Sequence, residues 1–396
     1  MKTLIVTPRY APEIGAAPTR WTNMANGLAD CGDEVDVLTA LPNHPKGRIF
    51  EGYRGCLTKK ETWGKCTVYR YWTLASVSIN PIVRGLGIIA FATMMWGFAF
   101  HPRRIKKYDR VIIQTPQLIT AMSAMMLFKG LYNKKVFLNI SDIWPLTAVV
   151  LGAMREGSII YKVFATIERY VYRKADGIIG QSDEILEHAA QYPHKGRMFR
   201  YRNLKPLDTS VGVHHRGEVL KVVYAGQLGI AQDILGIIRG VDFKAIGIEM
   251  HIYGGGKQKE EVEDYIARHP GNVFYHGMLS KEEMTNELRK YDASLIPLAV
   301  RIPGAVPSKI FDTLPMAMPI VFCGGGEGAK IVEDNNLGYT STPGDYEALT
   351  ANLKKLAALT ADEYTAISAR CLDFSHKELD FTKQIHACWK YMNGVG

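Results

Sequence analysis

Short apolar runs alternate with amphipathic stretches along the first half of the chain. The runs span Leu4–Thr7, Glu34–Thr39, Val111–Gln114, Val136–Asn139 and Gly177–Gly180. Strands buried on both faces of a sheet have this apolar character, and strands that alternate with helices form parallel sheets covered by helices on both faces. The first half is therefore predicted to fold as a doubly wound α/β domain.

The same alternation returns at shorter spacing in the second half. Its apolar runs span Leu220–Ala225, Glu249–Tyr253, Val273–His276, Ala293–Pro297 and Pro319–Cys323. A chain of 396 residues is too long for one ordinary core, so two domains of roughly 200 residues are expected. The irregular stretch Asn203–Gly217 is the predicted linker. We expect an N-terminal domain over residues 1–205, a C-terminal domain over 206–375, and a final helix within 376–396 that packs back on the N-terminal domain.

Glycine-rich turns follow several of the predicted strands. Gly15 lies in the loop after the first strand, Gly226 to Gly229 follow the strand 220–225, and Gly254 to Lys257 follow the strand 249–253. Open parallel sheets bind ligands at the carboxyl ends of their strands, where such turns let a ligand approach the backbone. The first loop lacks the GxGxxG spacing of a dinucleotide site, which disfavours NAD and FAD.

A lysine and a carboxylate stand three residues apart in the sequence Pro307-Ser308-Lys309-Ile310-Phe311-Asp312, so a helix would place both on one face. The strand 319–323 follows, and then a glycine-rich loop with Glu327. This arrangement predicts a clamp for the phosphate and sugar of a negatively charged, nucleotide-type ligand. The alternative is a solvated ion pair on a helix surface.

Composition narrows the choice of partners. The chain has 48 Lys and Arg against 39 Asp and Glu, a net charge of +9, which favours nucleic acid, anionic lipid or a phosphorylated substrate. Its six cysteines show no CxxC spacing, so we expect reduced thiols and a cytoplasmic location. No carboxylate pair with metal-ligand spacing stands on the predicted rim, so no metal cofactor is expected.

The segment Pro81–Phe100 carries one charged residue, Arg84. A basic cluster follows it directly and consists of His101, Arg103, Arg104, Lys106 and Lys107. A membrane span needs roughly 20 apolar residues, whereas the charge-free part of this segment, Gly85–Phe100, is shorter and is interrupted by glycines. The segment is therefore expected either to lie on an anionic membrane surface, with the basic cluster on the headgroups, or to be a buried helix of the first domain.

Several motifs together resemble the bacterial glycosyltransferases of family four. They are Pro-Glu-x-Gly-Ala-x-x-x-Arg from Pro12 to Arg20, Asp142-Ile143-Trp144-Pro145, Glu168-Arg169, Arg173-Lys174-Ala175-Asp176, Tyr224-Ala225-Gly226-Gln227-Leu228-Gly229, and Pro307-Ser308-Lys309 with Glu327. Within that family the chain is similar to the N-acetyl-L-fucosamine transferase type of capsule and O-antigen assembly.

The resemblance implies a GT-B fold, in which two Rossmann-like domains face each other across a deep cleft. It also implies a UDP-sugar donor held mainly by the C-terminal domain, transfer with retention of configuration, and no required metal. The acceptor would be a glycan linked to polyprenyl pyrophosphate, which places the enzyme peripherally on the inner face of the bacterial cell membrane.

Site residues follow from the matched motifs. The predicted donor-binding residues are Gly15, Gly226, Gly229, Gly254, Lys257, Ser308, Lys309, Asp312 and Glu327. The predicted acceptor or cleft residues are Glu13, Arg20 and Trp144, and the predicted catalytic residues are Asp142 and Lys309. Asp142 would orient the acceptor hydroxyl or act as a base; the alternative is an N-cap of the helix that follows.

The chain departs from the family pattern at two places. The family's pair of glutamates falls on Gly304 and Asp312, so only the second acid is kept, one methylene shorter. Gln227 and Gln232 stand where many members have Arg and Lys. Two other functions stay open: a sugar-nucleotide epimerase of the same fold, and a nucleic-acid-binding protein, which the dispersed lysines and the lack of a recognised module disfavour.

Overall fold

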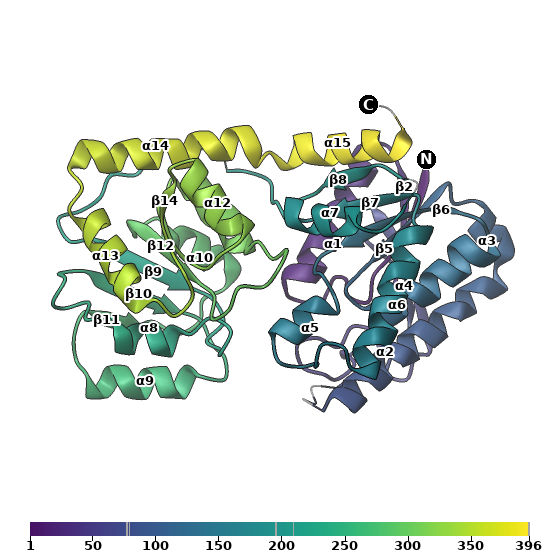
Figure 1. Ribbon diagram of the computed structural model, residues 1–396. Coiled ribbons are helices and arrows are strands. Elements are labelled where there is room, and N and C mark those ends of the chain that lie inside the picture. The colour runs from purple at the N-terminus through teal and green to yellow at the C-terminus, as the bar shows by residue number, and fades with distance from the viewer. Residues whose placement is uncertain (77, 79, 195, 209, 395–396) are drawn as a thin grey trace. The chain divides into compact units, whose positions relative to one another are not determined.

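The computed structural model describes residues 1–76, 78, 80–194, 196–208 and 210–394. The chain divides into two compact units, the first made of residues 1–203 with 382–396 and the second of residues 204–381. Both are α/β units with parallel sheets, which confirms the predicted fold class (Figure 1).

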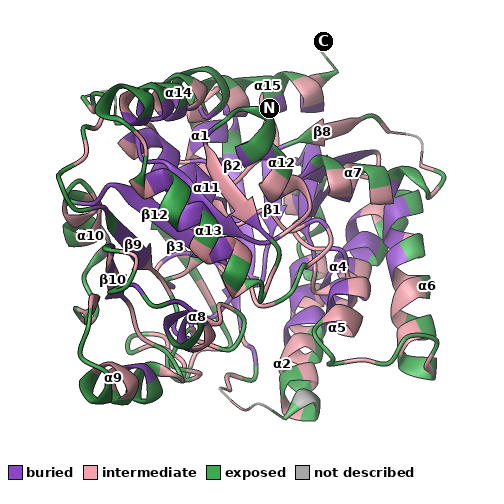
Figure 2. Ribbon diagram, turned by 60° about the vertical axis from the view of Figure 1, so that its left-hand side comes forward, coloured by how far each residue is buried: buried purple, intermediate pink, exposed green. Residues whose placement is uncertain are grey.

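The first unit contains an eight-stranded sheet in the order β3-β4-β2-β1-β5-β6-β7-β8. Its strands are β1 (Lys2–Val6), β2 (Glu34–Ala40), β3 (Thr58–Trp63), β4 (Cys66–Tyr71), β5 (Arg110–Gln114), β6 (Lys135–Ile140), β7 (Gly177–Gly180) and β8 (Met198–Arg200). All neighbouring strands pair in parallel except β3 and β4. The central strands are buried, as their apolar runs predict (Figure 2).

Helices cover this sheet. They are α1 (Ala16–Asp30), α2 (Pro81–Met94) with a 3-10 extension over Met95–Phe100, α3 (Pro102–Lys106), α4 (Leu118–Met125) with a π-helical extension over Met126–Leu131, α5 (Leu146–Val150), α6 (Ile159–Lys174), α7 (Asp183–Ala190) and α15 (Phe381–Asn393). Local chemistry fixes where some of them begin. The hydroxyl groups of Ser158 and Ser182 accept hydrogen bonds from backbone N–H groups in the first turns of α6 and α7.

The apolar segment 81–100 as a whole fits neither of its two predictions, a helix on a membrane surface or a buried helix of the first domain. Phe91, Met95 and Phe98 pack in the core of the first unit, and Trp96 donates a 2.8 Å hydrogen bond from Nε1 to Ser123 Oγ. The other half of the helix projects from the core, so Ile82 is 71% exposed. Residues 82–100 form one helix that is long and apolar enough to cross a membrane by length and composition alone, with 22% of its most apolar window buried.

The second unit contains a six-stranded parallel sheet in the order β11-β10-β9-β12-β13-β14. Its strands are β9 (Lys221–Ala225), β10 (Glu249–Tyr253), β11 (Val273–Tyr275), β12 (Ala293–Pro297), β13 (Ile320–Cys323) and β14 (Gly338–Ser341). Its helices are α8 (Ile234–Gly240), α9 (Lys259–Arg268), α10 (Lys281–Leu288), α11 (Ser308–Thr313), α12 (Glu327–Asp334), α13 (Tyr346–Ala357) and α14 (Ala361–Glu378), with a 3-10 turn over Leu314–Met316.

The strand order of this second sheet reverses between β9 and β12. These neighbours pair only where Ala293 meets Val222 and Ser294 meets Val223, at the beginning of β12. Beyond Ser294 the two strands are no longer paired. A reversal point of this kind is where open α/β sheets bind ligands.

The observed divisions of the chain fall close to the expected ones. The units meet at 203/204, beside the expected boundary at 205/206, and residues 201–208 and 210–220 form no helix or strand. Residues 376–378 end α14 in the second unit, whereas α15 is a separate helix whose residues from Thr382 onward belong to the first unit. Within the first unit, Trp389 of α15 donates a 2.9 Å hydrogen bond to the buried Asp33.

Candidate functional site

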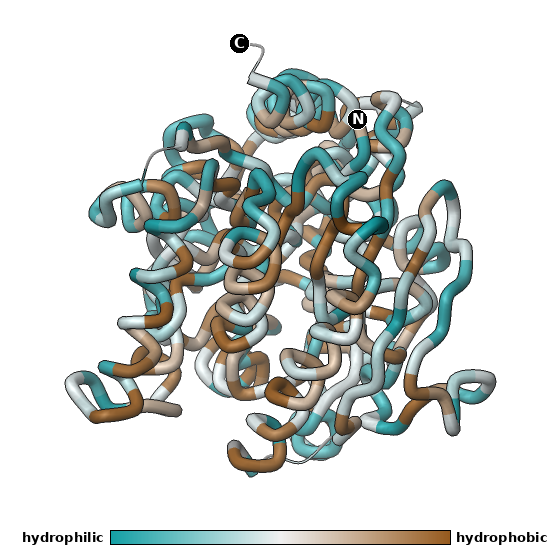
Figure 3. Tube along the Cα trace, turned by 90° about the vertical axis from the view of Figure 1, so that its right-hand side faces the viewer, coloured by the Kyte–Doolittle hydropathy of each residue, from teal (hydrophilic) through white to brown (hydrophobic). Residues whose placement is uncertain are grey.

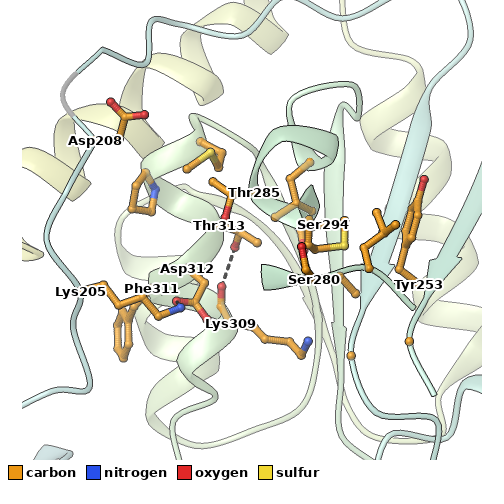
Figure 4. Close-up of a pocket in the computed structure, with 18 of the residues that line it drawn as sticks. Lys205, Asp208, Tyr253, Ser280, Thr285, Ser294, Lys309, Phe311, Asp312 and Thr313 are labelled. Carbon is orange, nitrogen blue, oxygen red and sulfur yellow. Dashed lines mark hydrogen bonds and ion pairs between the residues drawn. The ribbon is translucent and has the colours of Figure 1, made fainter. Parts of the chain in front are cut away.

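A cavity of about 560 Å³ lies where β9 and β12 separate, a volume typical of small-ligand sites. The turn after β9, the turn after β10, helix α11 and the chain segment Leu204–Asp208 line it. Of the predicted donor residues, Gly226, Gly254, Lys309 and Asp312 come together here (Figure 4). They derive from three separate segments of the sequence.

Lys309 reaches from α11 toward the turn after β9 (Figure 4). A Cβ atom at Gly226 would stand 2.5 Å from the Lys309 Nζ, so the amine occupies the space that a side chain would take. The ammonium also lies 5.3 Å from the centre of the Tyr224 ring. Burial lowers the pKa of Lys309 to about 8; nearby Asp312 opposes this shift and Lys205 adds to it. The amine therefore lies in a desolvated site, where a bound anion would stabilise its charged form.

Asp312 forms an ion pair with Lys205, not with its helix neighbour Lys309. The alternative prediction, a solvated ion pair between Lys309 and Asp312 on the helix surface, is therefore wrong. Lys205 was missed because it lies in the predicted linker, where a lone lysine before a proline carries no signal of a site. It adds a second cation to the cavity lining, which then contains two ammonium groups, of Lys205 and Lys309, and two carboxylates, of Asp208 and Asp312.

The two glycine turns of the cavity touch backbone to backbone. Gly254 has a φ of 139°, and a Cβ atom there would lie 1.7 Å from the carbonyl oxygen of Gly226. The Tyr275 hydroxyl donates a 2.7 Å hydrogen bond to the Gly254 carbonyl and holds this turn in place. Only glycine fits at Gly254, because both the backbone conformation and the space exclude a side chain.

Four other predicted donor residues, all within the described part of the second unit, do not line the cavity: Gly229, Lys257, Ser308 and Glu327. Lys257 is exposed, Ser308 opens α11, and Glu327 opens α12. Gly304, where the resemblance leads one to expect the family's first glutamate, is buried and has a φ of 75°, a conformation that disfavours other residues.

The opposite wall of the cavity was also missed by the sequence prediction. Met278, Leu279 and Ser280 precede α10, and Met284 lies on it. The Ser280 side chain caps α10 in a capping box with Glu283. The serine and glutamate spacing predicts a helix start but says nothing about a ligand, so only the fold shows that this segment faces Lys309.

In the first unit, Glu13 holds two loops together. Its Oε1 accepts hydrogen bonds from the backbone N–H of Asn43 at 2.8 Å and of His44 at 2.9 Å, and from Arg9 at 3.1 Å. Glu13 is 7% exposed, so its carboxylate is committed to these partners. The predicted contact of Glu13 with an acceptor would therefore have to act through the loops that it positions.

Arg20 and Asp142 lie near each other at the carboxyl edge of the first sheet. Arg20 is 5% exposed, and its guanidinium donates to the Ser141 hydroxyl. Burial lowers the pKa of Arg20 to about 10, although Asp142 opposes the shift, and burial raises the pKa of Asp142 against the effect of Arg20. The helix that follows, α5, has Pro145 at its N-cap and no side-chain cap, so the helix-cap alternative for Asp142 is wrong.

Gly15 and Trp144 occupy loops at the same edge. Gly15 directly precedes α1 and has a φ of 147°, where a Cβ atom would lie 3.8 Å from the His44 ring. Trp144 is half-buried and packs edge-on against Phe164 of α6, with ring centres 6.3 Å apart. Among the residues that the structure describes, no group of three or more His, Cys, Asp or Glu side chains could hold a metal ion.

Comparison with known proteins shows which families the two units match. Residues 15–199 match the family described as Glycosyl transferase 4-like domain, and residues 221–358 match Glycosyl transferases group 1. The putative colanic acid biosynthesis glycosyl transferase WcaI of Escherichia coli K12 is 23% identical over 342 residues, which cover 79% of this chain and 81% of WcaI.

Two solved structures share the fold over the full length of both chains. Sucrose-phosphate synthase from Thermosynechococcus elongatus has a TM-score of 0.73 at 12% identity. HepE from Anabaena, solved with UDP, has a TM-score of 0.71 at 12% identity. The fold is GT-B, and the two units of this chain are the two domains of a glycosyltransferase of that type.

Replacing Lys309 with alanine should weaken the binding of UDP by about 1.5–3 kcal/mol, the range of a charge-assisted contact, and leave uridine binding nearly unchanged. Calorimetry with both ligands measures the difference. Lys244→Ala, an exposed lysine of the same unit outside the cavity, is the matched control. Equal losses for UDP and uridine would remove Lys309 from the phosphate site.

The affinity for UDP should also fall as the pH rises through about 8, because the Lys309 amine loses its charge in this range. The loss should approach about tenfold per pH unit above that value, up to the full contribution of the amine. Lys309→Arg should bind UDP without this dependence, because a guanidinium stays charged. Titration calorimetry from neutral to alkaline pH makes the comparison, and a flat wild-type profile would contradict it.

Proposed function

We propose that this protein transfers a sugar from a UDP-sugar to a lipid-linked glycan acceptor, with retention of configuration, in the assembly of a bacterial surface polysaccharide. The observation that carries the proposal is the cavity between β9 and β12, which joins a desolvated lysine, a carboxylate and two glycine turns. A nucleotide sugar offers the matching groups: a diphosphate, a ribose diol and a flat base.

Each part of the donor has a counterpart in the cavity. The Asp312 carboxylate can accept hydrogen bonds from the ribose hydroxyls, and the Lys309 ammonium can contact the diphosphate beside the Gly226 backbone. Met278 and Leu279 offer an apolar wall for the base. HepE, which shares the fold, has been solved with UDP and also with UDP-glucose, and this supports a uridine nucleotide as the donor carrier.

The chemistry depends on charge at the leaving group. When the bond between the sugar and the phosphate breaks, negative charge develops on the diphosphate. A preorganised ammonium in a dry site stabilises that charge better than water does, because it needs no reorganisation during the reaction. Lys309 fills this role. Lys205 forms an ion pair with Asp312, and it could turn toward the diphosphate once ribose hydroxyls bind to the Asp312 carboxylate.

The acceptor is assigned to the first unit. Asp142 stands beside Arg20 at the carboxyl ends of its strands, where its carboxylate can orient an acceptor hydroxyl or accept its proton. The raised pKa of Asp142 brings it closer to that of a useful base. WcaI is described as a colanic acid biosynthesis enzyme, and this supports a polysaccharide product.

The direct test is transfer of labelled sugar from UDP-sugars into the organic phase of a bacterial lipid extract. Label in the lipid together with UDP release supports the proposal. UDP-sugar isomers that form without any lipid extract would instead indicate an epimerase, and binding of nucleic acid without UDP affinity would exclude both enzymes.

Asp142→Asn should lower the turnover in this assay by roughly 100-fold or more, because the amide cannot accept the proton of the acceptor hydroxyl. The affinity for UDP and the melting temperature should stay near wild type, since the side chain caps no helix. Wild-type turnover in this variant would exclude Asp142 from the acceptor side.

Transfer should persist in an excess of chelator, because the lysine at the cavity carries the charge that a metal ion would otherwise supply. The assay is run with EDTA and then with added magnesium or manganese. Loss of activity that either ion restores would show that the donor site requires a metal.

A further inference from the structure

Seven exposed aliphatic residues of the first unit lie at or near the beginnings of two helices. Ile82, Leu86 and Ile89 lie on α2 at positions i, i+4 and i+7, so they share one face, and they are 71%, 50% and 47% exposed. Ile159, Ile160 and Val163 begin α6 and are 82%, 61% and 51% exposed. Leu151, directly after α5, is 49% exposed. We call these seven residues the tip surface.

Topology places both helix starts at the same edge of the sheet. Helix α2 connects β4 with β5, and α6 connects β6 with β7, which are all parallel strands. A helix that connects parallel strands runs against them and so begins at their carboxyl ends. Helix α4 packs against both α2 and α6, which separates the two starts by on the order of 20 Å. Figure 3 shows hydrophobic segments at the lower ends of these helices.

The charges around the tip surface are mainly positive. Residues 82–100 contain no acidic residue and one cation, Arg84, whereas residues 146–167 contain Arg155, Lys162 and a single carboxylate, Glu156. All four charged side chains are exposed. The tip surface consists only of aliphatic side chains, whereas protein interfaces are enriched in aromatic residues. Exposed aliphatic side chains surrounded by cations suit an anionic lipid bilayer. The aliphatic side chains insert among the lipids, and the cations contact the anionic headgroups.

We propose that the first unit docks on anionic membranes through this tip surface, end-on and not along the length of the apolar helix. The basic cluster expected to share the contact lies at the other end of that helix, about 28 Å away at 1.5 Å per residue. There the Arg104 guanidinium lies 4.7 Å from the centre of the Tyr69 ring and 5.5 Å from that of Phe98. The core packing of Phe91, Met95 and Phe98 also prevents the helix from crossing a bilayer while the unit stays folded.

The same edge carries the loops assigned to the acceptor. Trp144, two residues after Asp142, packs on Phe164, which is the neighbour of the exposed Val163 on α6. Docking at this edge would therefore bring the acceptor loops to the level of the lipid headgroups. This last step rests on the proposed function, whereas docking itself does not.

Flotation of the full-length protein with vesicles tests the proposal without donor or acceptor. Wild type should float with phosphatidylglycerol-phosphatidylethanolamine vesicles at low salt, and much less with phosphatidylcholine vesicles or at high salt. The double variant Ile82→Ser, Ile160→Ser should lose at least tenfold in partitioning, and Arg84→Gln with Lys162→Gln should lose only the preference for anionic lipid. Melting temperature and UDP affinity verify that the variants are folded.

The matched control is Phe100→Ser with Leu131→Ser. These residues are 85% and 62% exposed and end the extensions of α2 and α4, so they lie at the opposite edge of the same sheet. The control should float like wild type. Three results would each overturn the proposal. They are an equal loss of vesicle binding in the apolar double variant and in the control, no preference of wild type for anionic vesicles, and self-association that Ile82→Ser abolishes. Failed flotation with intact transfer to a soluble acceptor would reject the docking and leave the proposed function standing.

Discussion

The second unit is organised around one desolvated ammonium group. The Lys309 amine fills the space that Gly226 leaves empty, and burial reduces its basicity, so the folded protein bears the cost of removing this cation from water before any ligand arrives. An incoming anion therefore meets a charge that is already positioned and poorly hydrated. The separation of β9 from β12 provides the room, and the contact between the two glycine turns fixes the backbone beside this amine.

The first unit handles its buried charges in a different way. Glu13 satisfies two backbone N–H groups and Arg9, while Arg20 is held by Ser141 beside Asp142. Losing one partner of a buried charge is costly, whereas the intact contact contributes little net stability, so the effect of these contacts is to hold loops in defined positions. The buried charges of the first unit therefore hold its loops in place, whereas the second unit keeps a poorly hydrated ammonium at its cavity.

The sequence predicted most of the scaffold because buried parallel strands have an unmistakable apolar pattern. All ten apolar runs form strands. Four strands escaped prediction: β3, β8 and β14 lie at sheet edges, and β4, which lies between β3 and β2, has polar residues among its apolar ones. Their pairing depends on neighbouring strands from distant parts of the chain, and the local composition does not indicate which strands those are.

Site residues were less predictable for the same reason. Lys309 and Asp312 stand out because helix periodicity links them, but the partner of Asp312 is Lys205, more than a hundred residues away. The burial of Trp96 against Ser123 was equally hidden, because a continuous apolar segment does not reveal which half meets the core. Contacts between distant segments decide which polar groups become functional, and these appear only once the chain is folded.

Gly304 has a consequence for how this site could change. A glutamate at that position would have to adopt a left-handed backbone conformation, which costs L-residues roughly 1–2 kcal/mol. A carboxylate introduced here by a single substitution would therefore carry this backbone cost before it made any contact, unless the loop changed as well. Engineering that aims to add an acid to this loop would therefore have to begin with the backbone at Gly304.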